Sequence, residues 1–532
     1  MAEPKKQNYL HGAAILAAGV VIMKVLGAIY KIPLGNILGD EGYAHFLVAY
    51  NIYSVFLTLA TAGLPVALSR MISEANTMNR PNQVRRIFSV AWWTFFVLGV
   101  VCTLIMALFP TQLADMLSDI EAAKSIFVLS PAVLLVCLTS AYRGYCQGHE
   151  NMTPTTVGQV LEVLAKVVAG LALAWYLTGS GHTLSTSSAG AIFGVTVGSL
   201  VALAYMFIYK RRHYRDGASG TDMPESRGKV LRTLLRVAIP ITLGSSVLSL
   251  INLIDSGLCM GRLQDAAGFS YQEATVLYGV YGKAQTLYNL PASFITPLTI
   301  SVVPAIAAAM VLHHSKDASR IVENSMRIAV VVALPMGVGL SVLAQPIMDT
   351  VYPDSHASGG VLLTIMGIAS FFVCMALMMN AILQAGGNEK YPIYSMIAGG
   401  AVKIGVNWVL VANPEINIVG APIGTLCCYA VMCVMDFAFI CKCLPERPSL
   451  GRILLRPAIA CAAMGLTAWA VYGLGSGFLG AGRLYTAVAM VLAIGAAVIV
   501  YFVLVVVLRA ITYEDMKLIP KGEKLARILH IK

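Results

Sequence analysis

The chain has 532 residues, of which 58% are hydrophobic and only 12% are charged, and its mean hydropathy is +0.76. Because soluble domains are about one quarter charged, this composition excludes an ordinary soluble protein and predicts helices surrounded by lipid. The formal net charge of +11 does not indicate a nucleic-acid partner, since the basic residues cluster between apolar runs, as in the cytoplasmic loops of membrane proteins.

Apolar windows of about 20 residues predict membrane helices, because that length crosses the hydrocarbon core of a bilayer. The chain contains fourteen such windows and is therefore expected to be an all-α integral membrane protein. The first window follows two lysines but is too long for the apolar part of a signal peptide, so we expect a retained helix. The predicted helices span 10–33, 44–69, 87–110, 125–147, 155–178, 188–210, 233–256, 284–312, 321–344, 360–384, 391–412, 418–441, 453–475 and 484–508.

The distribution of basic residues predicts the topology, because cytoplasmic loops are rich in Lys and Arg. If both termini and the even-numbered loops face the cytoplasm, all but eight of the 37 Lys and Arg residues lie on that side. Three of the eight lie deep inside helices, and five lie at the opposite surface. We therefore expect a multi-pass plasma-membrane protein with both termini in the cytoplasm.

The longest polar segment divides the first twelve predicted helices into two sets of six, which indicates two lobes joined by a linker. Two more helices and a basic tail follow the second set. The expected parts are an N-terminal lobe at 1–210, a cytoplasmic linker at 211–232, a C-terminal lobe at 233–441, two further helices within 442–508 and a cytoplasmic tail at 509–532.

The two lobes share a sequence pattern at a fixed spacing. Gln147 and Gln384 are 237 residues apart, and each lies in a turn that contains glycine and proline. Lys166 and Lys403, in the helices that follow these turns, have the same spacing of 237 residues. Both copies run from the cytoplasmic to the outer side, so we expect parallel repeats related by an axis along the membrane normal.

Three lysines, Lys24, Lys166 and Lys403, lie deep inside predicted membrane helices. A basic side chain near the bilayer centre costs about 2.5–3.5 kcal/mol, so it usually faces a water-filled cavity or a partner. The sequence therefore predicts a positively charged interior path and an anionic cargo.

Two pairs of charged residues extend this hypothesis, and each has a second interpretation. Lys31 follows Lys24 by two helical turns, so both lie on one face; Lys31 either continues a ladder for a diphosphate or only reaches the outer head groups. Glu162 and Lys166 are four residues apart, which is typical of an ion pair; Glu162 either has this structural role or takes part in gating and coupling.

The predicted helix 233–256 carries a polar stripe of Ser245, Ser249, Asn252 and Ser256, with Asp255 beside it. Such side chains commonly hold membrane helices together. Alternatively, Asn252 and Asp255 supply the amide and carboxylate oxygens of a Na⁺ site for ion-coupled transport. The sequence predicts no other metal site and no organic cofactor.

Charged residues at the cytoplasmic helix ends have two interpretations. Arg143, together with Arg70 and Arg86, either captures an anionic head group or only sets the orientation of the helices. Asp436 lies near the cytoplasmic end of the helix predicted at 418–441, and we expect it to pair with a basic loop residue.

Three segments resemble one membrane-protein family. The segments are RGYCQGHENMTPTT at 143–156, AIPITLGSSVLSLINLID at 238–255 and YGKAQTLYNLPASF at 281–294, and they are similar to the stage V sporulation protein B group. This group belongs with the polysaccharide and lipid II flippases of the MurJ type, in the multidrug/oligosaccharidyl-lipid/polysaccharide exporter superfamily. The resemblance extends over nearly the whole chain.

The resemblance implies a bacterial membrane protein with two six-helix lobes around a central cavity and two extra C-terminal helices. It also implies that basic residues of helices one, two and eight line that cavity. Lys24 falls where the family has a helix-one arginine, and Lys283 falls near the basic position of helix eight. The second predicted helix has no Lys or Arg between Tyr43 and Ser69 and so departs from the family pattern.

These observations predict a flippase rather than an enzyme, because the chain has no phosphate-binding loop for ATP and no HExxH or GxSxG motif. We expect it to move an undecaprenyl-diphosphate-linked sugar, such as lipid II, outward by alternating access, in cell-wall or spore-wall synthesis. Its expected partners are this anionic lipid and the membrane lipids, it is expected to work as a monomer, and a monovalent cation is a candidate for coupling. The alternatives are a cation-coupled multidrug exporter of the same superfamily and a non-transporting scaffold in sporulation or division.

Overall fold

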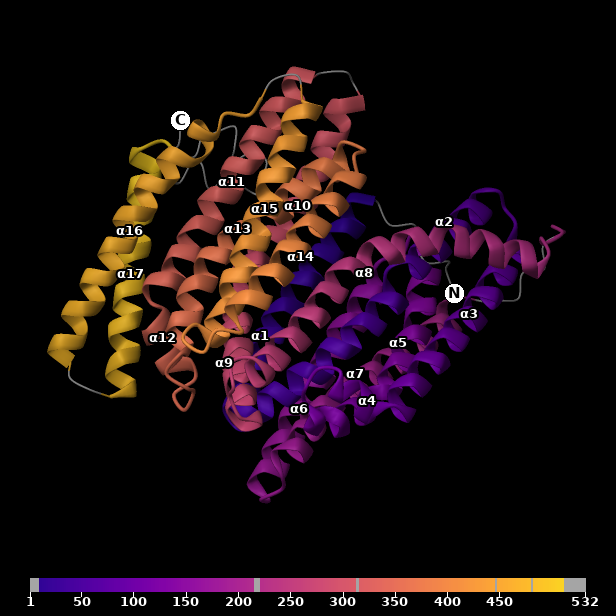
Figure 1. Cartoon of the computed structure of the whole chain (residues 1–532). Coiled ribbons are helices and arrows are strands. Elements are labelled where there is room, and N and C mark those ends of the chain that lie inside the picture. Colours follow the sequence, from indigo (N-terminus) through magenta and orange to yellow (C-terminus); the bar gives the residue numbers. More distant parts are fainter. Residues whose placement is uncertain (1–8, 215–220, 312–314, 445–446, 480–481, 511–532) are drawn as a thin grey trace. The chain divides into compact units, whose positions relative to one another are not determined.

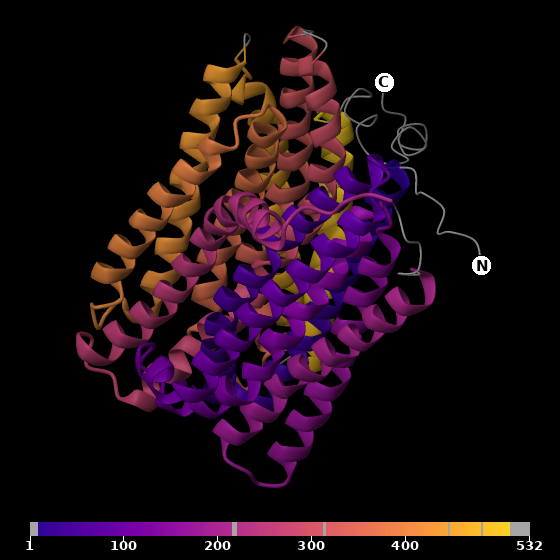
Figure 2. The same cartoon turned by 90° about the vertical axis from the view of Figure 1, so that its right-hand side faces the viewer.

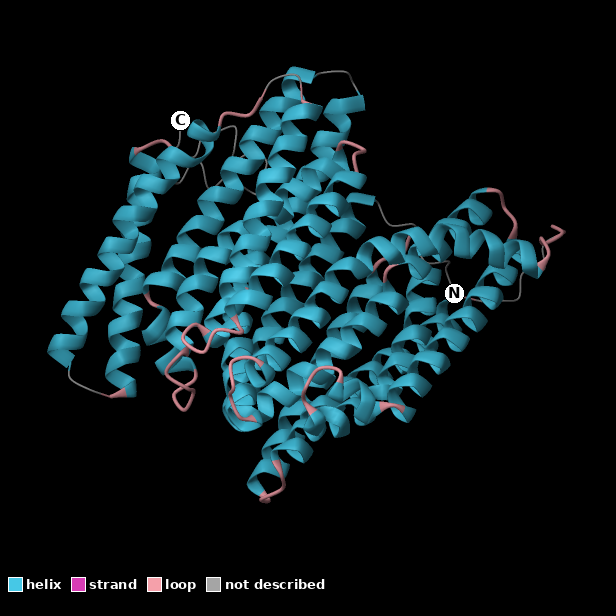
Figure 3. Cartoon of the chain, viewed as in Figure 1, coloured by secondary structure: helices cyan, strands magenta, loops and turns pink. Residues whose placement is uncertain are grey.

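The computed structural model describes residues 9–214, 221–311, 315–444, 447–479 and 482–510. Within these ranges, every regular element is a helix (Figures 1 and 3). Twelve helical segments of the described chain are long and apolar enough to cross a membrane. The prediction of an all-α integral membrane protein is therefore confirmed, whereas the count of fourteen is approximate.

Two regions account for the difference between fourteen and twelve. The helices predicted at 10–33 and 44–69 meet without a loop and form one candidate span with α2. The helix predicted at 284–312 is divided between α9 (Tyr271–Tyr288) and α10 (Leu290–Val311), and neither is among the candidate spans. The true start of α9 was missed because it depends on a capping box, in which the Ser270 hydroxyl accepts a bond from the Glu273 N–H at 3.3 Å.

The first helix, α1 (Tyr9–Thr61), changes direction at Gly39. This residue has φ 68° and ψ −169°, a combination that is open essentially only to glycine. A methyl group at this position would meet no atom within 4 Å, so the glycine is needed for the backbone conformation and not for space. The kink joins the two helices that hydropathy predicts separately.

The chain forms two compact units, Met1–Gly261 and Arg262–Lys532, which we call unit 1 and unit 2. The helices of unit 1 are α1, α2 (Gly63–Thr77), α3 (Pro81–Leu108), α4 (Pro110–Asp115), η1 (Ile120–Ala122), α5 (Ala123–Gly148), α6 (Thr153–Gly179), α7 (Leu184–His213) and most of α8 (Arg227–Asp265). The helices of unit 2 are the end of α8, α9, α10, α11 (Ser315–Val342), α12 (Ala344–Val351), α13 (Gly359–Ala385), α14 (Lys390–Leu410), η2 (Asn417–Val419), α15 (Gly420–Cys443), α16 (Leu450–Leu479) and α17 (Arg483–Val507).

In unit 1, α6 packs closely along α7, and both contact α1 (Figures 1 and 2). The close approach depends on glycines. A methyl group on Gly194 of α7 would lie 2.5 Å from the backbone nitrogen of Gly170 on α6, and one on Gly198 would overlap the carbonyl oxygen of Glu162. Because backbone meets backbone here, α6 is held at a fixed distance from α7, as in other small-residue contacts between membrane helices.

The described end of the linker is tied to the start of α3. The Asp222 carboxylate accepts hydrogen bonds from the backbone N–H groups of Asn82 and Gln83, at 3.0 and 2.9 Å. The guanidinium of Arg80 also donates to the Met223 carbonyl, at 2.8 Å. The carboxylate thus satisfies amides of the first turn of α3 that have no partner within the helix. Helix α7 ends at His213 and helix α8 begins at Arg227, so the connection between them is shorter than the predicted 211–232 linker.

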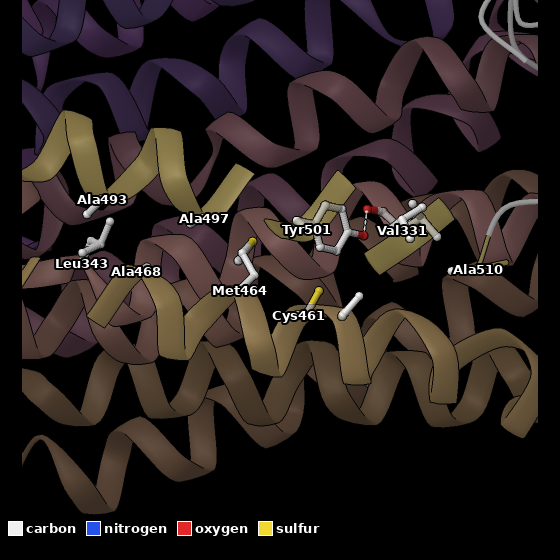
Figure 4. Packing of buried hydrophobic residues seen from close by; sticks show 11 residues of the cluster. Val331, Leu343, Cys461, Met464, Ala468, Ala493, Ala497, Tyr501 and Ala510 are labelled. Atoms are coloured by element: carbon white, nitrogen blue, oxygen red, sulfur yellow. Dashed lines mark hydrogen bonds between the residues drawn. The ribbon is translucent and has the colours of Figure 1, made fainter. Parts of the chain in front are cut away.

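In unit 2, the last two helices pack against each other and against α11 (Figure 4). Small residues such as Ala460, Ala468 and Ala493 allow α16 and α17 to approach closely. The Tyr501 hydroxyl donates a hydrogen bond of 2.6 Å to the Val331 carbonyl of α11. The two C-terminal helices are therefore an integral part of the core of unit 2.

The repeated turns have the same backbone geometry in both units. Glu150, after α5, and Gly387, after α13, are 237 residues apart, and both have left-handed backbones, with φ 58° and φ 73°. The next residue donates its N–H to a carbonyl five residues back in each copy, from Asn151 to Cys146 at 3.1 Å and from Asn388 to Leu383 at 3.0 Å. The structure therefore supports the internal repeat at the level of these turns.

Candidate functional site

The structure brings three of the predicted lysines together in unit 1, and we call them the lysine cluster. Lys24 and Lys31 lie on α1 before the kink, and Lys166 lies on α6, which packs against α1. The Lys166 Nζ lies 5.5 Å from the ring centroid of Tyr30, the residue before Lys31, and Lys24 lies two helical turns before Lys31, so the three ammonium groups share one region. The Lys24 side chain is exposed and the other two are half-buried. The cluster can therefore receive an anion at Lys24 and surround it with further positive charge.

Aromatic rings support two of these lysines. The Lys31 Nζ lies 5.7 Å from the ring centroid of Tyr50, and the Lys166 Nζ lies 5.5 Å from that of Tyr30. The Tyr30 hydroxyl is fixed by a 3.0 Å hydrogen bond to the Ala191 carbonyl of α7. Such cation–π contacts partly compensate a lysine for lost hydration and leave its N–H groups available to a ligand.

The expected ion pair between Glu162 and Lys166 does not form. Glu162 instead accepts a bond from Arg143 of α5, with Nη2 and Oε2 2.5 Å apart, and both side chains are largely buried. Lys166 makes no ion pair with any carboxylate of the described chain. Arg143 thus neutralises Glu162, and no carboxylate of the described residues forms an ion pair with the lysine cluster. The predicted role of Arg143 in binding, and that of Glu162 in gating or coupling, stay predictions.

The position of Lys166 follows from the packing of α6 on α7. A methyl group added to Gly194 would lie 2.7 Å from the carbonyl oxygen of Lys166, and a methyl group added to Gly198 would lie 3.2 Å from the Lys166 Cβ. The glycines of α7 therefore contact the backbone at Lys166 directly. The height and rotation of this lysine on α6 are set by backbone contacts, which deform less than side-chain contacts.

The polar stripe on α8 divides into residues that hold helices together and residues that are exposed. Ser249 shares a 2.8 Å hydrogen bond with Thr58 of α1, and Ser256 is buried, whereas Ser245 and Asn252 are exposed. Asp255 is buried and accepts a weak bond from the Cys259 thiol at 3.8 Å. In the described residues, no three His, Cys, Asp or Glu side chains are grouped to hold a metal ion. A Na⁺ site at Asn252 and Asp255 stays a prediction.

The other two predicted lysines lie in the interior of unit 2. Lys283 of α9 is 2% exposed, and its Nζ lies 5.2 Å from the ring centroid of Tyr352. Lys403 of α14 is 5% exposed, and Asn407, one turn further on, is fully buried. Both lysines are much less accessible than Lys24. Their predicted contact with substrate is untested.

The N-terminal part of the sequence matches a known family. A model described as polysaccharide biosynthesis protein covers residues 9–310, which is more than half of the chain. The chain belongs to this family.

Curated relatives extend the match over the rest of the chain. The membrane protein YabM of Bacillus subtilis is 26% identical over 99% of this chain and 97% of its own. Stage V sporulation protein B of the same organism is 28% identical, over 83% and 85% of the two chains. The lipid II flippase MurJ of Bacillus subtilis is 25% identical, over 81% and 82%.

Solved structures show the same fold. MurJ in an inward closed conformation superposes with a TM-score of 0.67, at 12% identity, over 92% of this chain and 99% of that one. An inward-facing multidrug transporter of the MATE family gives a TM-score of 0.66, at 15% identity, over 80% and 97%. The chain is thus a multi-pass membrane protein of the flippase and transporter superfamily that the sequence motifs indicate, and that prediction is confirmed.

Sequence reasoning also missed a buried pair between α1 and the residue before η1. The His45 Nδ1 of α1 donates to the Asp119 carboxylate, at 2.8 and 2.9 Å from its two oxygens, and both side chains are fully buried. Glu121 lies 3.9 Å from the other ring nitrogen. The partners are separated by 74 residues, so no local spacing predicts them.

A second expectation, concerning Asp436, is wrong. Its side chain is fully buried in α15. No basic side chain of the described residues forms an ion pair with it. Proximity to the end of a helix predicts pairing with a loop residue only if the side chain faces outward, and Asp436 faces the packed interior.

Proposed function

We propose that this protein flips an undecaprenyl-diphosphate-linked sugar, lipid II or a related cell-wall or polysaccharide precursor, from the inner to the outer leaflet of the plasma membrane. The single observation that carries the proposal is the lysine cluster of unit 1. The identity to stage V sporulation protein B and to the lipid II flippase MurJ supports the same class of substrate.

When a diphosphate head group crosses the membrane, polar groups of the protein must replace the water molecules that hydrate it. Ammonium groups supply strong charge-assisted hydrogen bonds to phosphate oxygens, and their effect is larger where water is scarce. Like charges that are held in one region repel each other, so the empty site is disfavoured and a bound anion relieves this cost. The cluster therefore favours a multivalent anion over a neutral or cationic cargo.

The transport cycle that fits this substrate is alternating access between two lobes, with the head group in a cationic cavity and the lipid tail in the bilayer. In this proposal both termini are cytoplasmic, because the basic loops then lie inside. Energy comes from an ion gradient, the membrane potential or downhill release. We take the monomer as the functional unit.

The test is the leaflet accessibility of labelled precursor in cells that depend on this protein. We expect Lys24→Ala to abolish outward movement at normal expression, Lys24→Arg to retain part of it, and Lys166→Gln to reduce it. Lys124→Ala is the control, because Lys124 is an exposed lysine of the same unit outside the cluster. Full activity of Lys24→Ala would contradict the role of the cluster.

The same cells distinguish the flippase from a multidrug exporter. A strain that lacks the protein should accumulate the precursor in the inner leaflet and keep its susceptibility to cationic drugs. Increased drug susceptibility with unchanged precursor movement would replace the flippase by the exporter.

A further inference from the structure

Two open cavities lie side by side on unit 1, away from the lysine cluster. The first has a volume of about 420 Å³, and the second, of about 360 Å³, shares Arg85 and Ser89 with it. Neither is lined by a residue of the cluster. The residues of the first cavity that matter here are Arg85, Phe88, Trp92, Trp93, Tyr145 and Lys210.

The wall formed by α3 is cationic at one end and aromatic at the other. Arg85, Phe88, Trp92 and Trp93 recur at helical spacing and therefore lie on one face of α3. Arg85 stands just before the apolar run of this candidate membrane span, and the two tryptophans lie two turns inside it. Tryptophan and basic residues concentrate at this depth, where head groups meet acyl chains.

The opposite wall places a second cation beside this face. The Lys210 Nζ of α7 lies 4.5 Å from the ring centroid of Phe88 and 5.0 Å from that of Tyr145. Tyr145 is itself held by Phe88, with ring centroids 4.8 Å apart. The aromatic rings thus place the ammonium group at the rim of the cavity.

No carboxylate lines either cavity in the part of the chain that the structure describes. Arg85 forms no ion pair or hydrogen bond with a described residue, and the second cavity adds Arg86 and Arg227. The nearby acids of the linker have other partners: Asp222 accepts bonds from the backbone of α3, and Glu225 forms a 2.6 Å ion pair with Lys229. The pair of cavities is therefore strongly positive and open beside an apolar surface, on which Trp93 is 59% exposed.

We propose that these cavities bind the phosphate head group of an anionic phospholipid. Arg85 and Lys210 contact the phosphate, Arg86 and Arg227 extend the positive field, and the indole of Trp93 lies along the glycerol and upper acyl chain. Basic pockets between membrane helices on the cytoplasmic side are suited to such head groups. The site is distinct from the proposed transport path and holds a resident lipid.

The experiment measures lipid retention by native mass spectrometry of the full-length protein in mild detergent, with added phosphatidylglycerol or phosphatidylcholine. We expect the wild type to retain phosphatidylglycerol in preference to phosphatidylcholine. Each basic residue beside an anionic head group contributes roughly fivefold in affinity, so the double variant Arg85→Ala/Lys210→Gln should bind about 25-fold more weakly. Arg211→Ala is the matched control, because Arg211 is exposed and lines neither cavity.

Two further arms keep the proposal falsifiable. The charge-retaining variant Arg85→Lys/Lys210→Arg should keep most of the phosphatidylglycerol, and its melting temperature shows whether loss in the first variant reflects unfolding. Equal retention by the wild type and a folded Arg85→Ala/Lys210→Gln protein would overturn the site. Loss of undecaprenyl diphosphate but not of phosphatidylglycerol in that variant would also overturn it, because the ligand would then be the transported lipid.

Discussion

Substitution of Gly194 by alanine tests whether the α6–α7 contact sets the position of Lys166. The added methyl group would lie 2.5 and 2.6 Å from the N and Cα of Gly170 and 2.7 Å from the Lys166 carbonyl oxygen. Ordinary contacts begin at 3.4 Å, so the helices must separate by roughly 1 Å, and a backbone cannot rotate away as a side chain does.

Overpacking of this kind costs about 1–3 kcal/mol, and alanine recovers about 0.5–1 kcal/mol of helix propensity, so we expect a net loss of about 1 kcal/mol. The assay is the thermal unfolding of purified variants in one detergent, together with precursor flipping in cells. Gly405→Ala is the control, because Gly405 is also helical and a methyl group there meets nothing within 4 Å. We expect a lower melting temperature and reduced flipping for Gly194→Ala only.

The reasoning would be refuted if Gly194→Ala melted at or above the temperature of the wild type. It would also be refuted in part if stability fell while flipping per folded molecule stayed normal. In that case the helix contact would stabilise unit 1, but the exact position of Lys166 would not matter for transport.

Three other predictions concern the fold. Desolvation raises the pKa of the Asp222 carboxyl, but hydrogen bonds from backbone N–H groups of α3 outweigh this effect, so the pKa is lowered. The contribution of Asp222 to stability is therefore complete above about pH 4 and is lost at lower pH. Proteolysis of the linker should increase on acidification and, at neutral pH, in Asp222→Asn; cleavage that is the same after both changes would contradict this. Gly39→Ala should destabilise the protein by about 1–3 kcal/mol, because its backbone conformation suits only glycine. Gly27→Ala, in a regular helix where a methyl group also meets nothing within 4 Å, should stabilise the protein by about 0.5–1 kcal/mol. The opposite order of melting temperatures would exclude the explanation from backbone conformation. Tyr501→Phe removes a buried 2.6 Å hydrogen bond and should lower stability by about 1 kcal/mol in the same assay, and an unchanged melting temperature would argue against a net contribution.

Hydropathy and the internal repeat predict most of the fold, because membrane helices need long apolar runs and repeated turns keep their sequence pattern. The boundaries that sequence reasoning missed depend on local chemistry that hydropathy does not report. The capping box at Ser270 starts α9 inside a polar stretch, and the conformation of Gly39 joins two helices without a loop.

The candidate site shows a similar division. Helical spacing places Lys24 and Lys31 on one face of α1, since that relation is local. The partner of Glu162 is Arg143, on the preceding helix, and this pairing depends on how α5 packs near α6. The pairing of His45 with Asp119 likewise depends on tertiary contacts, so neither pair could be derived from spacing along the chain.

The presence of three ammonium groups in one region of unit 1 has a consequence for the return half of the proposed transport cycle. In the proposed cycle, the site must reset after release of the lipid, while it carries positive charge without its cargo. A small permeant anion such as chloride would screen that charge, whereas a bulky one such as gluconate would fit poorly. The kind of anion in the medium should therefore affect the rate at which the empty protein returns more strongly than the rate at which the lipid-bound protein moves.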